Sequence, residues 1–355
     1  MKTGRKFWNY PTLMMIMLSM FVHGCGWLEQ EEEQIPTVTT DAVSDISSTL
    51  AVCSGSVIST GGSWWVNRGI CYSDIIAEPT LNGTFRWADA GSHTGSFSVI
   101  LDYLTPGTKY YVRAYASNDA GDGYGNVIEF TTTGSVVGDI VFNPDLTYGS
   151  LTDIEGNEYK TIIIGDQTWM AENLKTTKYN DNTDIPLVTV LSNWSSLTTP
   201  GYCWYLNDEV KYKNTYGALY NWHTVNTGKL CPAGWHVPGD AEWATLASYS
   251  GGTSVAGNQL KEAGTTHWVT TETGVTNSSG FTALPGGTRW GVLTDPVSYF
   301  TDLGYTGHFW SATEFSDSEH GFYGAYSRTL DRSREEYERS SFTKSQGLSV
   351  RCIQD

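Results

Sequence analysis

Short stretches of alternating apolar and polar residues occur throughout the first third of the chain. Between residues 36 and 133 they lie around Leu50 to Val57, over Trp65 to Tyr72, at Phe97 to Leu101 and over Val127 to Thr132. Successive side chains of a strand point to opposite faces, so a period of two predicts strands with one buried face. We therefore expect residues 36–133 to form a β-rich domain.

The rest of the chain mixes strands with a helix. Apolar runs at 151–154 and 159–164 flank Glu155-Gly156-Asn157, a pattern that predicts a β-hairpin. Pro238-Gly239-Asp240 is expected to open a helix, because the residues that follow place Trp243, Leu246 and Ala247 on one face.

A segment without sustained periodicity separates these two halves. Residues 134–148 contain Gly134, Gly138 and Pro144, which favour turns over regular elements. We predict a linker here that ends in a short strand. The second domain is then expected to span residues 149–355.

The N-terminus has the pattern of a secreted lipoprotein. Basic residues precede an apolar run from Leu13 to Val22, and Cys25 follows the run closely. The run is about ten residues long, far short of the roughly twenty that span a bilayer as a helix. We predict that residues 1–24 are a signal peptide, that Cys25 carries a lipid and that residues 25–35 form an acidic tether. His23 occupies a position usually held by a small residue, so a plain secretory signal with a fortuitous cysteine is the alternative.

An acidic cluster follows the predicted lipid site. It comprises Glu29, Glu31, Glu32 and Glu33 and resembles the surface-export signal of Bacteroidota lipoproteins. A solvated tether is the simpler interpretation of the same residues. The resemblance implies a protein that is lipid-anchored in the outer membrane and exposed at the cell surface.

Charge excludes one class of partner. The chain has 38 acidic and 21 basic residues, for a net charge of -17. Nucleic acid and anionic membrane surfaces are bound by clustered Lys and Arg. The one arginine-rich stretch, residues 328–339, is interleaved with acidic residues, so we expect no nucleic-acid partner.

The cysteines favour an oxidising compartment. Cys53 and Cys71 lie on adjacent predicted strands and could pair, whereas a Cys231 to Cys352 bond would tie the turn before the helix to the C-terminal strand. Cys203 would then be free, although other pairings stay open. A zinc site that uses Cys203, Cys231, Cys352 and His236 is the alternative, but no Cys-x-x-Cys or His-x-x-x-His spacing supports it. We expect neither a metal nor a cofactor.

Six ordered sequence blocks resemble the Fibrobacter succinogenes major paralogous domain over roughly residues 149 to 355. They are WMAENL at 169–174, YGALYNW at 216–222, CPAGWHVPGDAEWATL at 231–246, FTALPGG at 281–287, FWSATE at 309–314 and GLSVRC at 347–352. The family is known as a repeated surface module without established chemistry. The HVPGDAEW and GLSVRC blocks also look like C-type-lectin-like domains, which implies a loop-rich α+β domain whose termini lie close together.

The first domain has a resemblance of its own. LTPGTKYYVRAYASNDAG at 104–121 resembles the fibronectin type III signature, in which a tyrosine pins the corner between two strands. Tyr110 is the candidate. The expected fold class is thus β-rich and two-domain, an Ig-like or fibronectin type III-like β-sandwich followed by an α+β C-type-lectin-like domain.

Aromatic side chains supply the candidate ligand-binding residues. In C-type-lectin-like domains the late loops form the ligand face, and planar side chains give large contact area at small entropic cost. The candidates in the corresponding segments are Trp290, Tyr299, Tyr305, His308, Tyr323 and Tyr326. This interpretation predicts a non-catalytic surface module that binds an extracellular glycan or protein ligand, with the first domain as a stalk.

Two other function classes stay open. No nucleophile elbow, zinc-protease helix or phosphate-binding loop occurs, so we assign no catalytic residue. A carbohydrate-active or protein-modifying enzyme would use Glu172, Asp302 or Glu314, and paired carboxylates across a cleft would support it. A structural component of a surface assembly would instead show a flat face without a pocket.

The sugar-binding triplets of calcium-dependent lectins are missing, and an acidic calcium loop at Asp181 to Asp184 has little support.

Overall fold

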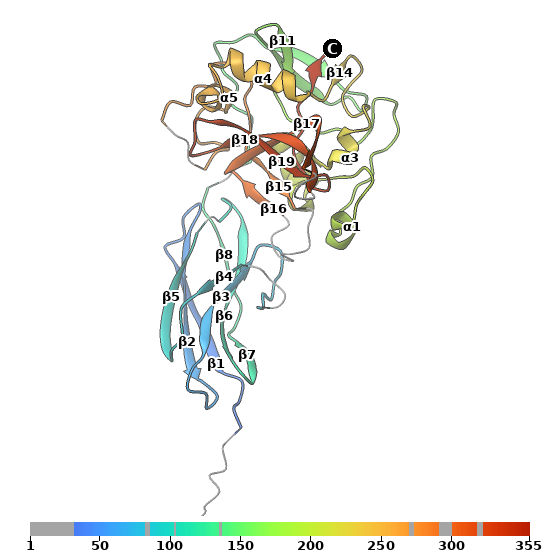
Figure 1. The fold of residues 1–355 in the computed structure, drawn as a ribbon. Coiled ribbons are helices and arrows are strands. Elements are labelled where there is room, and N and C mark those ends of the chain that lie inside the picture. The colour runs from blue at the N-terminus through green and yellow to red at the C-terminus, as the bar shows by residue number, and fades with distance from the viewer. Residues whose placement is uncertain are drawn as a thin grey trace, which may run out of the picture.

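The chain folds into two domains that lie end to end (Figure 1). This computed structural model describes residues 32–81, 86–102, 104–134, 137–269, 273–290, 300–317 and 322–355. The predicted signal peptide and Cys25 lie outside the described residues and stay predictions. Within the described ranges, no helix combines the length and apolar character needed to cross a bilayer.

Two antiparallel sheets form the N-terminal domain. One has the order β1-β2-β5, and the other has the order β4-β3-β6-β7 with β8 paired to β6. The strands are β1 (Thr37–Ser44), β2 (Ala51–Ser59), β3 (Asn67–Ser73), β4 (Arg86–Asp89), β5 (Gly95–Leu101), β6 (Lys109–Asn118), β7 (Gly121–Tyr124) and β8 (Ile128–Thr131). This is the expected fibronectin type III-like sandwich.

Strand β2 shows how the alternation specifies the sandwich. Cys53 and Val57 point into the core between the sheets and are buried. Ser54 and Ser56 point outward, where their hydroxyls lie within hydrogen-bonding distance of Ser98 and Ser96 on β5. The apolar face is therefore buried and the polar face forms cross-strand pairs.

Tyr110 is the corner tyrosine that the sequence predicts. Its hydroxyl accepts a hydrogen bond from the backbone N–H of Thr105 at 2.9 Å, and its ring stacks on Phe130. The Thr132 hydroxyl in turn donates to the carbonyl of Thr105 at 2.6 Å. These bonds fix the loop after β5, which faces the second domain.

The predicted pairing of Cys53 with Cys71 is wrong. Both thiols are free and buried, and they belong to strands of different sheets. Cys53 faces the core between the sheets with Ile70, whereas Cys71, the next residue along β3, points to the opposite face near Arg113. Burial raises the pKa of both thiols to about 12, so neither is a reactive thiolate at neutral pH.

The segment predicted as a linker packs against the C-terminal domain from residue 137 onward. Its apolar residues that contact the second domain's cores are Val137, Ile140, Phe142, Leu146 and Tyr148. The carboxylate of Glu262, which is fully buried against His267, accepts a hydrogen bond from the backbone N–H of Val141 at 2.7 Å. Residues 137–148 contain no strand, and β9 begins at Gly149. This segment is thus part of the second domain's packing.

Four sheets of the described residues build the C-terminal domain. The first has the order β14-β20-β11-β10-β9 and contains the predicted hairpin, β9 with β10. Because β20 lies between β11 and β14, the start and the end of the domain meet in one sheet, as expected. Its strands are β9 (Gly149–Thr152), β10 (Glu158–Ile164), β11 (Gln167–Met170), β14 (Trp235–His236) and β20 (Ile353–Gln354).

The other three sheets and the helices complete a mixed α+β domain. The pairs are β12 (Tyr202–Cys203) with β13 (Leu219–Tyr220) and β15 (Gly286–Arg289) with β16 (Phe300–Leu303), and the third sheet is β17 (Thr306–Asp317), β18 (Phe322–Asp331) and β19 (Tyr337–Thr343). The helices are α1 (Leu191–Ser195), η1 (Tyr205–Asn207), α2 (Glu209–Tyr216), α3 (Trp222–Val225), α4 (Asp240–Tyr249) and α5 (Ala256–Leu260).

Helix α4 starts and packs as its sequence predicts. Trp243, Leu246 and Ala247 are its buried residues. The Glu242 carboxylate accepts a hydrogen bond from the backbone N–H of Gly239 at 2.7 Å. An acidic side chain in the first turn thus gives a partner to a backbone N–H at the start of the helix.

Four of the six sequence blocks meet at one buried arginine. The Arg351 guanidinium donates to the side-chain oxygen of Asn173 at 2.7 Å and to the carbonyls of Met170, Phe281 and Thr282. It also lies over the rings of Phe281 and Phe309. Burial lowers the pKa of Arg351 to about 9, which leaves it protonated at neutral pH. These block residues therefore hold the core together.

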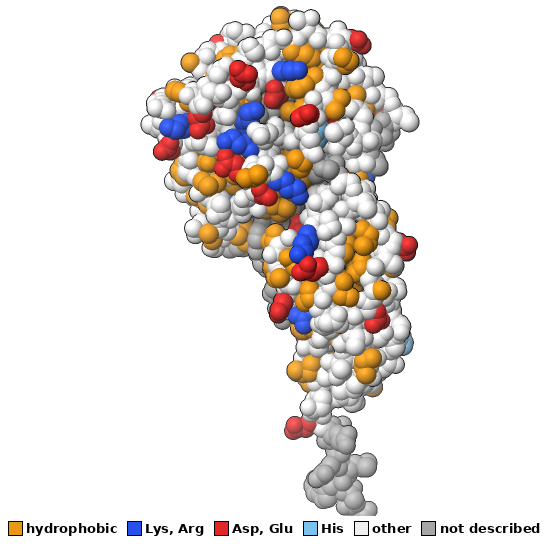
Figure 2. Space-filling model, turned by 180° about the vertical axis from the view of Figure 1, so that it is seen from behind, with side chains coloured by type: hydrophobic (Ala, Val, Ile, Leu, Met, Phe, Trp, Pro, Cys, Tyr) orange, Lys and Arg blue, Asp and Glu red, His pale blue; other side chains and the backbone are white. Residues whose placement is uncertain are grey.

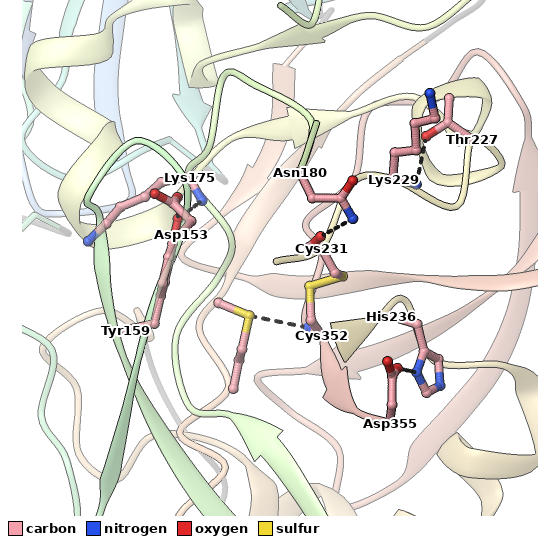
Figure 3. Close-up of a disulfide and its surroundings, with 11 residues drawn as sticks. Asp153, Tyr159, Lys175, Asn180, Thr227, Lys229, Cys231, His236, Cys352 and Asp355 are labelled. Atoms are coloured by element: carbon pink, nitrogen blue, oxygen red, sulfur yellow. Dashed lines mark hydrogen bonds and ion pairs between the residues drawn. A yellow bond between two sulfur atoms is a disulfide. The ribbon is translucent and has the colours of Figure 1, made fainter. Parts of the chain in front are cut away.

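The predicted disulfide between Cys231 and Cys352 is confirmed (Figure 3). It joins the turn before α4 to the C-terminal strand across 121 residues of sequence.

Nearby, His236 lies between Asp355 at 2.6 Å and Glu242 at 2.8 Å. The histidine thus ties the C-terminus to the start of α4, which supports a structural role. Because the disulfide engages two of the four residues of the zinc alternative, that site is excluded.

Candidate binding cleft between the two domains

A cleft of about 510 Å³ lies where the two domains meet. Tyr72, Asp102 and Thr105 of the N-terminal domain form one wall. The opposite wall comprises Tyr205, Thr301, Asp302, Tyr305, Thr306, Asp331, Arg332 and Ser333. On the face shown in Figure 2, acidic and basic side chains lie on both sides of the junction. The cleft therefore combines three tyrosines, three aspartates and one arginine.

Tyr305 joins the two walls. Its hydroxyl donates to the carbonyl of Leu104 at 3.0 Å, and the Arg332 guanidinium lies 4.5 Å from the centre of its ring. Burial raises the pKa of Tyr305 to about 12, although Arg332 acts in the opposite direction, so the hydroxyl stays protonated and can donate. Lys211 makes a second, longer contact with the carbonyl of Gly107 at 3.5 Å.

Asp302 has the most unusual backbone in the cleft. Its φ is 68°, a left-handed conformation that costs energy in a residue other than glycine. The Thr301 hydroxyl donates to its carboxylate at 2.8 Å, and the carbonyl of Asp302 accepts the N–H of Tyr305 at 2.9 Å. The Trp290 indole N–H donates to the same Thr301 hydroxyl at 2.9 Å. A chain of hydrogen bonds thus orients a carboxylate that is partly exposed to the cleft.

The turn after β18 carries the arginine of the cleft. The Asp331 carboxylate accepts the N–H of Ser333 at 2.8 Å, which orders the turn. The backbone N–H of Arg332 donates to the carbonyl of Tyr305 at 3.0 Å. This turn and the turn between β16 and β17 therefore hold Arg332 against Tyr305.

Two of the predicted ligand residues lie together at this cleft. Tyr305 lines it, and Trp290, whose side chain is 42% exposed, bonds to Thr301 at its edge. His308 is buried instead, with its ring against Phe342 and its Nδ1 3.0 Å from the Thr329 hydroxyl. Burial lowers the pKa of His308, while Asp302 acts in the opposite direction. The Nε2 atom of His308 lies 4.0 Å from the Asp302 carboxylate, beyond hydrogen-bonding distance.

The remaining candidates lie elsewhere. Tyr323 is exposed and Tyr326 is half-buried between Phe315 and Arg339, both on the far half of β18. Tyr323 lies eight positions before Asp331, a distance of about 27 Å along an antiparallel strand. Tyr299 lies outside the described residues. The six predicted residues thus do not form one surface.

Sequence reasoning missed the N-terminal wall of the cleft. Tyr72 and Asp102 line the cleft together with Thr105, yet they stand 230 and 200 positions before Asp302 in the sequence. Tyr205 and Arg332 were also missed. A separate pattern in each domain gives no signal for a site that forms only when the domains pack.

The carboxylates of the enzyme alternative lie in different surroundings. Glu172 accepts the N–H of Lys160, Glu314 pairs with Lys344, and Asp302 alone lines the cleft. In the acidic loop, Asp181 binds Lys229 and Asp184 lies near Lys178. Among the residues that the structure places, no group of three or more His, Cys, Asp or Glu is arranged to hold a metal ion.

Two similar solved structures resemble the N-terminal part. The sensor domain of the anti-sigma factor RsgI4 in Pseudobacteroides cellulosolvens is 18% identical, covers 28% of this chain and 96% of its own, and has a TM-score of 0.22. The fibronectin type III domain from human KIAA0970 is 18% identical over 32% of this chain and 85% of its own, with a TM-score of 0.22. Similarities this low say nothing about function, and the two sheets themselves make the domain fibronectin type III-like. No curated protein matches the chain.

The C-terminal part matches a family model. Residues 162–354, more than half of the chain, match the Fibrobacter succinogenes major domain. This range contains all six blocks, among them the four that meet at Arg351. The chain belongs to the Fibrobacter succinogenes major domain family.

Proposed function

We propose that this protein is a non-catalytic, lipid-anchored surface protein that binds a glycan in the cleft between its two domains. The cleft itself carries the proposal. Its volume of about 510 Å³ lies within the range of small-molecule sites. The N-terminal domain is then a wall of the site as well as a stalk.

The chemistry of the lining favours a saccharide. The faces of sugar rings pack against planar side chains such as the partly exposed Tyr72, and their hydroxyls pair with carboxylates and guanidinium groups. Asp302 is oriented by the Thr301 hydroxyl and stays partly exposed, so its carboxylate can accept further hydrogen bonds. A concave site of this kind also favours recognition over a purely structural role.

A glycan array tests the proposal directly. Residues 26–355 are screened as the wild type and as Asp302→Asn, because asparagine also tolerates a positive φ and the fold should be retained. Tyr323→Ala is the matched control, since this exposed side chain lies outside the cleft. We expect selective glycan binding that Asp302→Asn weakens at least about tenfold, a change of about 1.4 kcal/mol, and that Tyr323→Ala leaves unchanged.

Other results would point to the other function classes. Binding that survives in Asp302→Asn but fails in Tyr323→Ala would move the site to β18. Cleavage of the bound glycan, detected by mass spectrometry of the ligand, would establish an enzyme. A protein ligand in place of a glycan would appear as binding to host glycoproteins that survives deglycosylation.

A further inference from the structure

A pair of exposed tryptophans marks the end of the N-terminal domain that lies farthest from the cleft. Trp64 is 88% exposed and Trp65 is 38% exposed, and their ring centres lie 6.4 Å apart. They border a small hollow of about 270 Å³ with Thr60, Ser92, His93 and Thr94. Nothing in the proposed glycan site uses these residues.

The loop that carries the tryptophans is bonded to the start of the chain. The backbone N–H of Gln34 donates to the carbonyl of Gly61 at 2.7 Å. The Asn118 side chain donates to the carbonyls of Gln34 and Thr60 at 2.7 and 2.9 Å. The tryptophan loop therefore lies where the chain enters the domain, at the end opposite the C-terminal domain (Figure 1).

The neighbouring loop is held in a fixed position. The Arg68 guanidinium donates to the carbonyls of His93, Thr94 and Gly95 at 2.7 to 3.1 Å and lies over the ring of Phe97. The two loops thus form a defined surface.

The two loops themselves carry no charged side chain, whereas Glu33 and Asp119 adjoin their hydrogen-bond partners Gln34 and Asn118. Residues 58–66 and 90–95 contain no Asp, Glu, Lys or Arg. Ile35 and Ile58, which are 53% and 63% exposed, belong to the same end of the domain. Exposed tryptophan with few charges is typical of the interface between membrane and water, where the ring is apolar and its N–H remains hydrated.

With a lipid at Cys25, the length of the tether would keep this surface near a membrane. Gln34 lies nine positions after Cys25, the predicted lipid site. A fully extended chain of that length spans at most about 30 Å. A soluble ligand would have to enter this narrow gap, whereas lipid headgroups already lie there.

We propose that Trp64 and Trp65 insert into the interfacial region of the bilayer and orient the N-terminal domain on the membrane. The contact is apolar, since the net charge of the chain disfavours an electrostatic one. It rests on the anchoring at Cys25 that the proposed function includes. By holding the tether end against lipid, it directs the glycan cleft away from the surface.

The test uses tryptophan fluorescence in vesicles. Residues 25–355 are coupled through the Cys25 thiol to a maleimide lipid in phosphatidylcholine vesicles. The buried thiols of Cys53, Cys71 and Cys203 should not react. Emission is recorded with ordinary and with brominated phosphatidylcholine for the wild type, Trp64→Phe and Trp290→Phe, and each difference spectrum isolates one tryptophan.

We expect the Trp64 component to shift to shorter wavelength and to be quenched by the brominated lipid, and the Trp290 component to show neither effect. A Trp64 component that brominated lipid leaves unquenched would overturn the proposal. So would a Trp64 signal that soluble glycans change without vesicles, because the hollow would then be a saccharide site. The chemical coupling replaces native lipidation, which mass spectrometry of Cys25 tests separately.

Discussion

The hydroxyl of Tyr305 donates a hydrogen bond to the backbone carbonyl of Leu104, 3.0 Å away and 201 residues earlier in the chain. This bond joins the C-terminal domain to the loop that Tyr110 fixes in the N-terminal domain. The walls of the cleft are thereby set by two tyrosines, one in each domain. The relative position of the domains becomes part of the binding site.

Tyr305→Ala should loosen the two domains without unfolding either one. The change removes the bond to Leu104 and the ring that Arg332 covers. A single hydrogen bond contributes about 1 kcal/mol, so each domain should keep its cooperative unfolding. We expect small-angle X-ray scattering to show a wider distribution of interatomic distances, with Tyr323→Ala as the control. A scattering curve identical to the wild type would show that other contacts hold the junction.

Cys352→Ser should destabilise the C-terminal domain. Loss of a native disulfide that closes a long loop costs about 2–5 kcal/mol. Denaturant unfolding measures this loss, and reduction of the wild type should reproduce it. The variant itself should be insensitive to reductant. A wild type whose stability does not respond to reductant would contradict the bond between Cys231 and Cys352.

Arg351→Met should destabilise the same domain by a different route. The methionine leaves four oxygen acceptors in the core without their donor, and each unsatisfied buried group costs about 1–3 kcal/mol. Arg334→Met is the control, because that side chain is 62% exposed. Thermal denaturation should show a large loss for the first variant and almost none for the second. Equal stability of the two variants would refute the structural role of the GLSVRC block.

His236 should make part of the stability depend on pH. Burial disfavours the charged ring, but the hydrogen bonds with Asp355 and Glu242 outweigh it and raise the pKa of His236 above its ordinary value. The folded state therefore binds the proton more tightly, and the stabilisation is complete below the unfolded pKa of about 6.5. It is lost as the pH rises through the folded pKa. The difference in melting temperature between the wild type and His236→Gln should thus be largest in mild acid and smaller in alkali; the reverse trend would contradict this sign.

The sequence predicts local structure well and tertiary contacts poorly. Alternation around Cys53 and the turn at Gly156 indicate the strands that form, because these patterns depend on neighbouring residues alone. The pairing of Cys53 with Cys71 was predicted wrongly because it depends on tertiary structure. The pattern of a strand does not say which sheet the strand joins. The docking of residues 137–148 likewise depends on Glu262, which lies far away in sequence.

The sequence likewise predicts some residues of the candidate site and not others. Tyr305 and Trp290 could be predicted from a run of aromatic residues in late loops, and both lie at the cleft. His308 belongs to the same run but is buried, because both faces of β17 are covered from Thr306 to Ser311 and the sequence does not reveal this. Tyr72 and Asp102 become part of the site only when the domains pack.

The most direct test of a shared binding site is isothermal titration calorimetry with one variant on each wall. The best glycan from the array is titrated into the wild type, Asp102→Asn of the N-terminal wall and Asp302→Asn of the C-terminal wall. If the ligand lies between the domains, both variants should lower the affinity, each at least about tenfold, or about 1.4 kcal/mol. An affinity that Asp102→Asn leaves at the wild-type value, while Asp302→Asn lowers it, would place the ligand on the C-terminal domain alone and contradict a site built from both.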